Sequence, residues 1–581
     1  MSITKYSLII LSIMSSILCS MDSFIMMPFR TFDESGNLIN KTKLNEWLTN
    51  IKESGFKGVT SDFWWNIVEP ESKNYNFTPY IELAKEIQKM DLKLKVILSF
   101  HACGSTIGDE CFFPLPGWVS KTGNHIFYQD QNGNINKEYI SIFADDLQLS
   151  DGRPVLQAYQ DLISEFNSTF QDFYGDLIVN IEIGVGPAGQ LHYPSYSYKN
   201  AFCGVGFFQW YGSLAKQKFT EFLAEFKFEN EESNLISKKI ISLPSPTLKN
   251  VMNKPEQEYF FSELNINEKR CAVSEKTDCG HSKISQNECQ AKGCCWQEVA
   301  GDPYCFYSRE VYNYKADFGV VYMQWYQEEQ LKHLQRVLTI ARKILGFGVP
   351  LSLKLPCVHW MTDSKSRAAE KTAGFVSNQS QDVLEEEHEE LDEQNIELLH
   401  STFVPLFNTP ERDSFKSFSD LVAFSKTVNS YSEIFKISSL FRSKLVFSCV
   451  ELEDKQFDSV CQSAPQSLTN EIKDLSQKYS VSIIAENSET LNPSNVNHKL
   501  EIITNNLPGF FEFTYMRMND FELPRDEFKE VKNQIVSKVS KIESTNFYND
   551  EEMHWIEIVM TFDNPADAQN AMNELNNYMI I

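Results

Sequence analysis

The chain has 581 residues, which is long enough for one large domain with additions, and 42% of them are hydrophobic, as in soluble globular proteins. Its formal net charge of −26 argues against nucleic acid as a partner and favours neutral or cationic ligands. The same acidity also suits a protein that only needs to stay soluble outside the cell.

Residues 1–20 have the pattern of a secretory signal peptide. Lys5 supplies a positive charge, residues 8–18 form a short apolar core, and Ser20 is a plausible end for cleavage. The apolar run is too short for a membrane span, so we expect no stable membrane anchor after cleavage. The chain has 13 cysteines and four glycosylation motifs, which agree with a secreted, disulfide-bonded glycoprotein; the motifs lie at Asn40, Asn76, Asn167 and Asn378.

Residues 21–525 alternate between short apolar runs and amphipathic stretches. The apolar runs predict eight strands: 24–27, 58–63, 94–100, 177–183, 349–354, 445–450, 481–485 and 511–515. Helical periodicity lies between most of them, for example at 43–54, 80–90, 155–173 and 327–345. This order predicts the α/β class and a (β/α)8 TIM barrel, although the interval 184–348 is too long for one unit and must hold an insertion.

The insertion is a cysteine-rich segment at residues 268–309, which follows an irregular polar linker at 244–269. Six cysteines fall between positions 271 and 305, which suits a small module stapled by disulfides. A zinc site is the rival interpretation, but the segment lacks paired C-x2-C knuckles. The pattern resembles a trefoil (P-type) domain, and this resemblance implies the pairs Cys271–Cys295, Cys279–Cys294 and Cys289–Cys305.

The tail, residues 526–581, is predicted to be a short α/β appendage. It contains helix-like stretches at 531–541 and 565–575 and a strand-like stretch at 554–562. The acidic run at 384–393 is interpreted as the solvated face of a helix and not as a cation site.

Polar side chains follow the ends of the predicted strands, where a barrel of this kind places its reactive groups. Carboxylates, amides, histidines and tryptophans around one end of a barrel are typical of sugar binding, because aromatic faces pack on pyranose rings while polar groups bond to hydroxyls. The residues are Asp62, Trp64, His101, Asp109, Glu182, Lys354, His359, Ser448, Glu451, Glu486, Asn487 and Arg517.

The segment 184–196, GVGPAGQLHYPSY, resembles the active-site signature of the beta-amylases, which release maltose from α-1,4-glucans. Further segments are similar to this family in the same order along the chain: His101-x-Cys103-Gly104 with Gly108-Asp109, Lys354 to Trp360, 368–374, 447–451, 485–487 and 513–517. The resemblance covers nearly all of residues 24–520 and is interrupted by the insert.

The resemblance implies exo-hydrolysis from the non-reducing end of starch-like or glycogen-like chains, with inversion to β-maltose. One carboxylic acid protonates the glycosidic oxygen and a second carboxylate activates water, the two groups standing roughly 6.5–9.5 Å apart. Glu486 corresponds to the base. Substrate-binding roles are implied for Asp62, His101, Asp109, Lys354, His359, Ser448, Asn487 and Arg517. No metal or organic cofactor is expected, because two carboxylates and water suffice.

Position 190 departs from this family, because the residue that should donate the proton is a glutamic acid there and is Gln190 here. An amide cannot supply that proton. His192 is a second departure, since the family has arginine at this position. Three interpretations stay open: a glucan-binding protein without activity, a weak or altered hydrolase in which His192 or Glu182 donates the proton, or a sequence error or engineered change at position 190. The alternative function is that of a secreted lectin-like protein whose barrel binds glucan while the trefoil binds mucin-type or other glycans, or only stiffens a loop.

Overall fold

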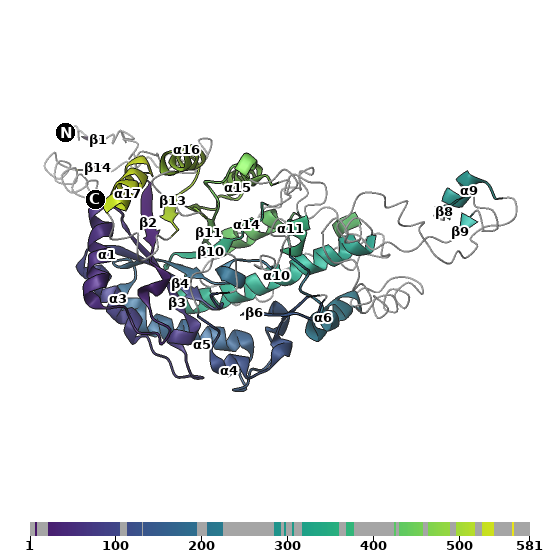
Figure 1. Ribbon diagram of the computed structural model, residues 1–581, viewed down its shortest axis with the longest axis horizontal. Coiled ribbons are helices and arrows are strands. Elements are labelled where there is room, and N and C mark those ends of the chain that lie inside the picture. The colour runs from purple at the N-terminus through teal and green to yellow at the C-terminus, as the bar shows by residue number, and fades with distance from the viewer. Residues whose placement is uncertain are drawn as a thin grey trace, which may run out of the picture.

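Eight parallel strands close into a barrel in the computed structural model (Figure 1). Each strand pairs with its neighbour in chain order, and the last pairs with the first, which confirms the predicted (β/α)8 architecture. Every predicted strand overlaps an observed one, with ends no more than three residues apart. The strands are β2 (Asp22–Met26), β3 (Gly58–Trp64), β4 (Lys93–Ser99), β7 (Ile178–Ile183), β10 (Leu351–Leu355), β11 (Ser443–Phe447), β12 (Ile483–Glu486) and β13 (Glu512–Tyr515).

The structure describes most, but not all, of the chain. The described parts are residues 6–7, 21–104, 113–130, 132–194, 206–224, 284–291, 295–297, 305–306, 317–359, 368–376, 423–425, 429–456, 463–488, 495–516, 526–539 and 561–562. The acidic run at 384–393 and the predicted helix at 565–575 lie outside them. Within them, no helix has the length and apolar character that a membrane crossing requires.

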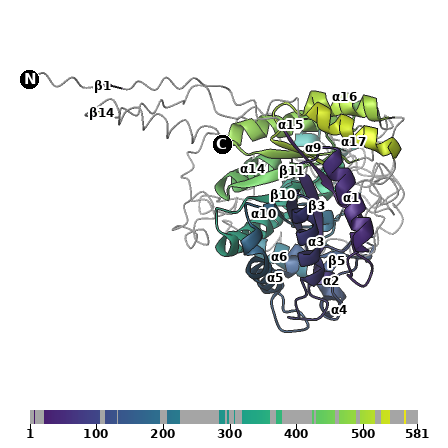
Figure 2. The same ribbon diagram turned by 90° about the vertical axis from the view of Figure 1, so that its left-hand side faces the viewer.

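Helices cover the outside of the barrel, and the late helix α17 (Asp526–Val539) lies beside the early helix α1 (Lys41–Glu53) (Figures 1 and 2). In α1 the side chains of Leu44, Trp47, Leu48 and Ile51 form one buried stripe, as the helical period requires. The other long helices are α3 (Thr78–Lys89), α5 (Val155–Phe170), α6 (Ser213–Ala224), α10 (Asp317–Leu345), α14 (Ser430–Leu440), α15 (Pro465–Tyr479) and α16 (Val496–Asn506).

Short elements occupy the connections. They are the helices α2 (Trp65–Val68), α4 (Gly117–Ser120), α9 (Gln286–Ala291) and α11 (Ala368–Thr372) and the strands β1 (Tyr6–Ser7), β5 (Phe127–Gln129), β6 (Ile135–Ile140), β8 (Cys295–Trp296), β9 (Cys305–Phe306) and β14 (Thr561–Phe562). Strands β8 and β9 form an antiparallel pair within the predicted trefoil segment, and β1 pairs with β14.

Helix α17 (Asp526–Val539) confirms the first element predicted for the tail. It packs against α16 and β2, and its residues Ile535 and Val539 are fully buried in the main hydrophobic core. The start of the predicted appendage is therefore part of the outer layer of the barrel.

The inside of the barrel is polar where many barrels are filled by branched apolar side chains. Lys95 on β4 makes an ion pair with Glu512 and a 2.8 Å hydrogen bond to Thr514, both on β13. Since β4 and β13 are not neighbours in the barrel, these side chains meet across its interior. Asn180 on β7 donates to Ser352 on β10 at 2.7 Å. The polar interior leads up to the C-terminal ends of the strands, where the predicted site residues lie.

Candidate active site

The predicted site residues within the described chain stand at the C-terminal ends of six barrel strands. Because the strands are parallel, these ends meet on one face of the barrel. Asp62 is in β3, His101 follows β4, Lys354 is in β10 with His359 after it, Ser448 follows β11, and Glu486 ends β12 with Asn487 next. Gln190 lies in the connection after β7. Asp109 and Arg517 lie outside the described residues.

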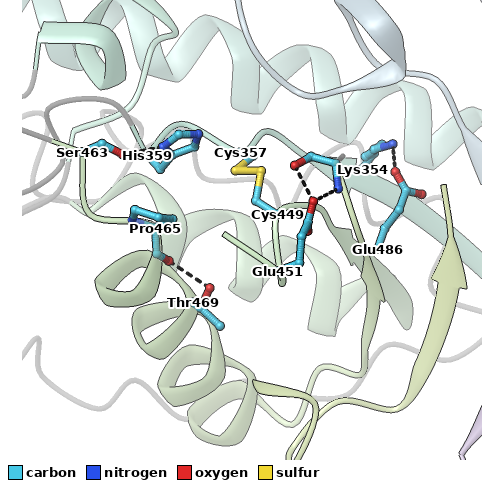
Figure 3. The surroundings of a disulfide bond; sticks show 10 residues. Lys354, Cys357, His359, Cys449, Glu451, Ser463, Pro465, Thr469 and Glu486 are labelled. Carbon is cyan, nitrogen blue, oxygen red and sulfur yellow. Dashed lines mark hydrogen bonds and ion pairs between the residues drawn. A yellow bond between two sulfur atoms is a disulfide. The ribbon is translucent and has the colours of Figure 1, made fainter. Parts of the chain in front are cut away.

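Lys354 joins the two positions implied for catalysis. Its ammonium makes an ion pair with the carboxylate of Glu486, and both side chains are buried (Figure 3). Its backbone forms a parallel bridge with Gln190, and its carbonyl accepts a 3.0 Å hydrogen bond from the amide of Leu191. Gln190 is half-buried, and within the described chain its side-chain amide has no hydrogen-bond partner. The side-chain amide of Gln190 and the Glu486 carboxylate that is paired with Lys354 thus lie beside the same end of β10.

Glu182 is another buried carboxyl group close to the Lys354–Glu486 ion pair. Burial raises its pKa to about 7, the Lys354 ammonium opposes that rise, and the charge of Glu486 adds to it. In the sheet register Glu182 is level with Ser352, two residues before Lys354. Its carboxyl group therefore belongs to the layer beneath Gln190 and titrates near neutral pH.

Replacing Glu182 with glutamine is expected to flatten the pH dependence of stability. The folded state raises this pKa from 4.5 to about 7, so between these values it keeps a proton that the unfolded chain has released. The free energy of unfolding therefore falls as pH rises through this window. Chemical unfolding of both proteins between about pH 5 and pH 8 measures the difference. Parallel curves for the two proteins would contradict the assignment.

The loop after β7 contains a tight turn with unusual backbone angles. Gly189 (φ +74°) and Ala188 (φ 51°) both adopt left-handed backbone, which is uncommon for alanine. Glu138 on β6 stabilises this turn, because its carboxylate accepts a 2.8 Å hydrogen bond from the amide of Ala188 while its carbonyl accepts one from Ala102, beside His101. Glu138 therefore connects the loop that carries His101 with the loop that carries Gln190.

Substituting alanine for Gly186 is expected to lower at least tenfold the glucan affinity that the sequence predicts for this site. A Cβ atom at this position would lie 2.2 Å from the carbonyl oxygen of Gln190, which is far inside van der Waals contact, so the loop must move. The matched control is Gly348→Ala, where an added Cβ meets nothing within 4 Å. Calorimetric titration with maltotetraose checks both variants. Equal affinity of Gly186→Ala and the unaltered protein would show that the loop does not position the ligand.

Burial lowers the pKa of two of the histidines in this region, His192 and His359. Burial lowers the pKa of His192 to about 4, and its Nδ1 lies against the carbonyl oxygen of Tyr193. Burial also lowers the pKa of His359 to about 3, and its Nδ1 lies 2.7 Å from the hydroxyl of Ser463 (Figure 3). At neutral pH His192 carries no imidazolium proton, which argues against the prediction that it could replace the missing acid.

The loop after β11 lies beside the segment that carries Glu486. The amide of Val450 donates to the carbonyl of Glu486 at 3.4 Å, and the carboxylate of Glu451 accepts hydrogen bonds from the amide (2.8 Å) and hydroxyl (2.9 Å) of Ser488. The hydroxyl of Ser448 is buried and has no hydrogen-bond partner in the described part of the chain. The side chain of Asn487 points towards β13, because its Oδ1 accepts a 2.7 Å hydrogen bond from the backbone amide of Met516.

Two disulfides lie wholly within the described chain. Cys289–Cys305 confirms one of the three predicted trefoil pairs; the other two involve residues outside the described ranges, although Cys295 is itself disulfide-bonded. Cys357–Cys449 joins the loops after β10 and β11 (Figure 3), a pairing that the sequence leaves open. The thiol positions of these two cysteines and a His359 nitrogen lie within 4.8 Å of one another. While the sulfurs are bonded to each other, this group lacks the thiolates that a zinc site needs.

Sequence comparisons agree with this geometry. The chain matches the glycosyl hydrolase family 14 profile over residues 24–264 and 290–422, and the trefoil (P-type) domain profile over residues 269–308. It is 28% identical to a chloroplastic beta-amylase 1 of Oryza sativa subsp. japonica over 80% of this chain and 70% of that protein. It is 26% identical to a beta-amylase of Vigna unguiculata over 88% of this chain and 86% of that protein.

A comparison of structures supports the fold independently. The catalytic domain of a beta-amylase from Paenibacillus polymyxa superposes with a TM-score of 0.57 at 20% identity, over 90% of this chain and 99% of that one. The barrel, the order of the strand-end residues and the extent of the profile match lead to one conclusion: the chain belongs to glycosyl hydrolase family 14, the beta-amylase family, and carries an inserted trefoil domain.

Proposed function

We propose that this protein binds the non-reducing ends of α-1,4-glucan chains at the C-terminal end of its barrel and hydrolyses them only slowly. The observation that carries the proposal is the position of Gln190 beside the Lys354–Glu486 ion pair. The amide occupies the place at which the family resemblance puts the proton donor. Within the described chain, Glu486 and the groups implied for sugar binding lie at the same end of the barrel.

The geometry supports a division of roles among these residues. Lys354 makes an ion pair with Glu486, whose carboxylate is the group implied to activate water. Gln190 can donate a hydrogen bond to a glycosidic oxygen but transfers no proton, so the leaving sugar departs as an unprotonated alkoxide. Turnover by this route would be inverting, because the activated water attacks from the face opposite the leaving sugar. The family resemblance implies that it would also be exo-acting.

A second candidate is an active hydrolase in which Glu182 supplies the proton, because burial raises the pKa of this carboxyl group to about 7, so that a large fraction of it carries a proton near neutral pH. Its place one layer below Gln190 makes it less suited to reach the glycosidic oxygen. Glu182→Gln separates the candidates, since it abolishes turnover only if Glu182 is the donor.

The test is to measure maltotetraose binding by calorimetry and β-maltose release from soluble starch by proton NMR, on the same unaltered protein. We expect binding together with very slow release. Rapid release of β-maltose would overturn the inactive-acid proposal, and failure to bind maltotetraose would overturn the glucan-binding proposal. Secretion, glycosylation and glycan binding by the trefoil stay predictions from the sequence.

A further inference from the structure

The disulfide Cys357–Cys449 crosses between two loops that both carry residues implied in sugar binding. Cys357 follows Lys354 by three residues and precedes His359 by two, while Cys449 is adjacent to Ser448. The bond closes a sequence separation of 92 residues. In Figure 3 the disulfide lies between His359 on one side and the Lys354–Glu486 ion pair on the other. The bond therefore connects parts of the site that are far apart along the chain.

The backbone at Cys449 departs from ordinary strand and helix geometry. Its φ of 75° lies in the left-handed region, which residues other than glycine rarely adopt. Such backbone persists only where the surroundings hold it in place. The sulfur bond to Cys357 is a covalent restraint at this same residue, so it is suited to hold the turn.

The turn at Cys449 determines where Ser448 and Glu451 lie. Ser448 is 4% exposed, and its hydroxyl has no hydrogen-bond partner in the described chain, so a buried polar group is left available to a ligand. Lys444 on β11 lies near the charges of Glu512 and Lys95, which act on its pKa in opposite directions. Ser448 is four residues further along, so the alternation of side chains along the strand puts it on the same face as Lys444. On the far side of the turn, the carboxylate of Glu451 accepts a hydrogen bond from the amide of Ser488, which is two residues after Glu486.

We propose that the Cys357–Cys449 disulfide is a positioning crosslink, which fixes the loop after β11 so that the Ser448 hydroxyl faces a bound glucan. The inference deepens the proposed function and rests on it for the identity of the ligand. The disulfide acts through Ser448 and does not itself touch the sugar. Without the bond, Cys449 relaxes out of the left-handed region and the Ser448 hydroxyl moves away from its binding position.

The experiment compares Cys357→Ser, Cys449→Ser and the double variant with the unaltered full-length protein. Maltotetraose affinity is measured by calorimetry at a temperature at which circular dichroism shows every protein to be folded. We expect the dissociation constant to rise about tenfold and to be the same in all three variants, because each removes one bond. Unequal effects of the two single substitutions, or unchanged affinity in all three, would overturn the proposal.

The matched control is Thr469→Val, which removes the 2.9 Å hydrogen bond from the threonine hydroxyl to the carbonyl of Pro465 near the same loops (Figure 3). It lowers stability without altering the crosslink, so the melting temperature should fall while maltotetraose affinity stays unchanged. If Thr469→Val weakens binding as much as the cysteine variants do, the disulfide has only a general stabilising role and the proposal fails.

A second measurement tests the crosslink without any glucan. Backbone amide hydrogen exchange at Val450 and Leu452, whose amides bond to Glu486 and Cys449, should be at least tenfold faster in Cys357→Ser, while exchange within β11 stays unchanged. Unchanged exchange at Val450 would overturn the positioning role. If the unaltered protein does not bind maltotetraose, the proposed function fails, and the exchange result alone decides on the crosslink.

Discussion

Replacing Gln190 with glutamate is expected to raise β-maltose release from soluble starch about 10²–10⁴-fold, the usual contribution of a general acid. The substitution is nearly isosteric and restores the one group that the site lacks for protonating a leaving sugar. The side chain at position 190 is half-buried and unpaired within the described chain, so the new carboxyl group displaces no existing hydrogen bond. Release is followed by proton NMR, which also reports the anomer of the product.

Two controls make this result specific. The double variant Gln190→Glu, Glu486→Gln keeps the new acid but removes the base, and it should release no maltose. Maltotetraose affinity of Gln190→Glu should stay within about threefold of the unaltered protein, so that any gain in rate is a gain in chemistry. If Gln190→Glu releases maltose no faster than the unaltered protein, position 190 is not the place of the proton donor.

Strand periodicity was sufficient to predict the barrel because each strand is a short apolar run followed by an amphipathic helix. The ends of β11 differ most from the prediction, since the apolar run at 445–450 continues into the loop and the strand ends at Phe447. Val450 is fully buried although it lies outside the strand. Apolar periodicity reports burial, and a buried loop beside the site has the same signature as a strand.

The contacts within the site were less predictable than the positions of its residues. Strand-end placement located Asp62, Lys354 and Glu486 on one face, but their pairings depend on side chains distant in sequence. Glu138 carries no motif that relates it to the loops it connects. Outside the site, Arg342 is fully buried and donates to carbonyl groups at positions 346, 349, 441 and 442, a role that only the folded chain reveals.

Substituting methionine for Lys354 is expected to lower the free energy of unfolding by about 3–5 kcal/mol at neutral pH, because removing one partner of a buried ion pair leaves the other uncompensated. Methionine keeps much of the lysine's apolar volume, so the loss reports charge more than packing. Glu486 would then be a buried carboxylate without its cation. The same substitution removes the charge that in the unaltered protein lowers the pKa of the nearby Glu182. Urea unfolding measures the loss.

The double variant Lys354→Met, Glu486→Gln should recover most of that stability, because it removes both charges of the ion pair together. The loss in the single variant should also shrink at low pH. A carboxyl group whose folded-state pKa is raised costs stability only as pH rises through the window between its unfolded and folded values, so acid relieves the cost. Equal losses at about pH 5 and pH 8, or a double variant as unstable as the single one, would show that Lys354 acts by packing and not through its charge. If the double variant recovers stability but loses glucan affinity, the ion pair contributes to ligand binding and is not needed for folding, because two neutral side chains then support the fold equally well.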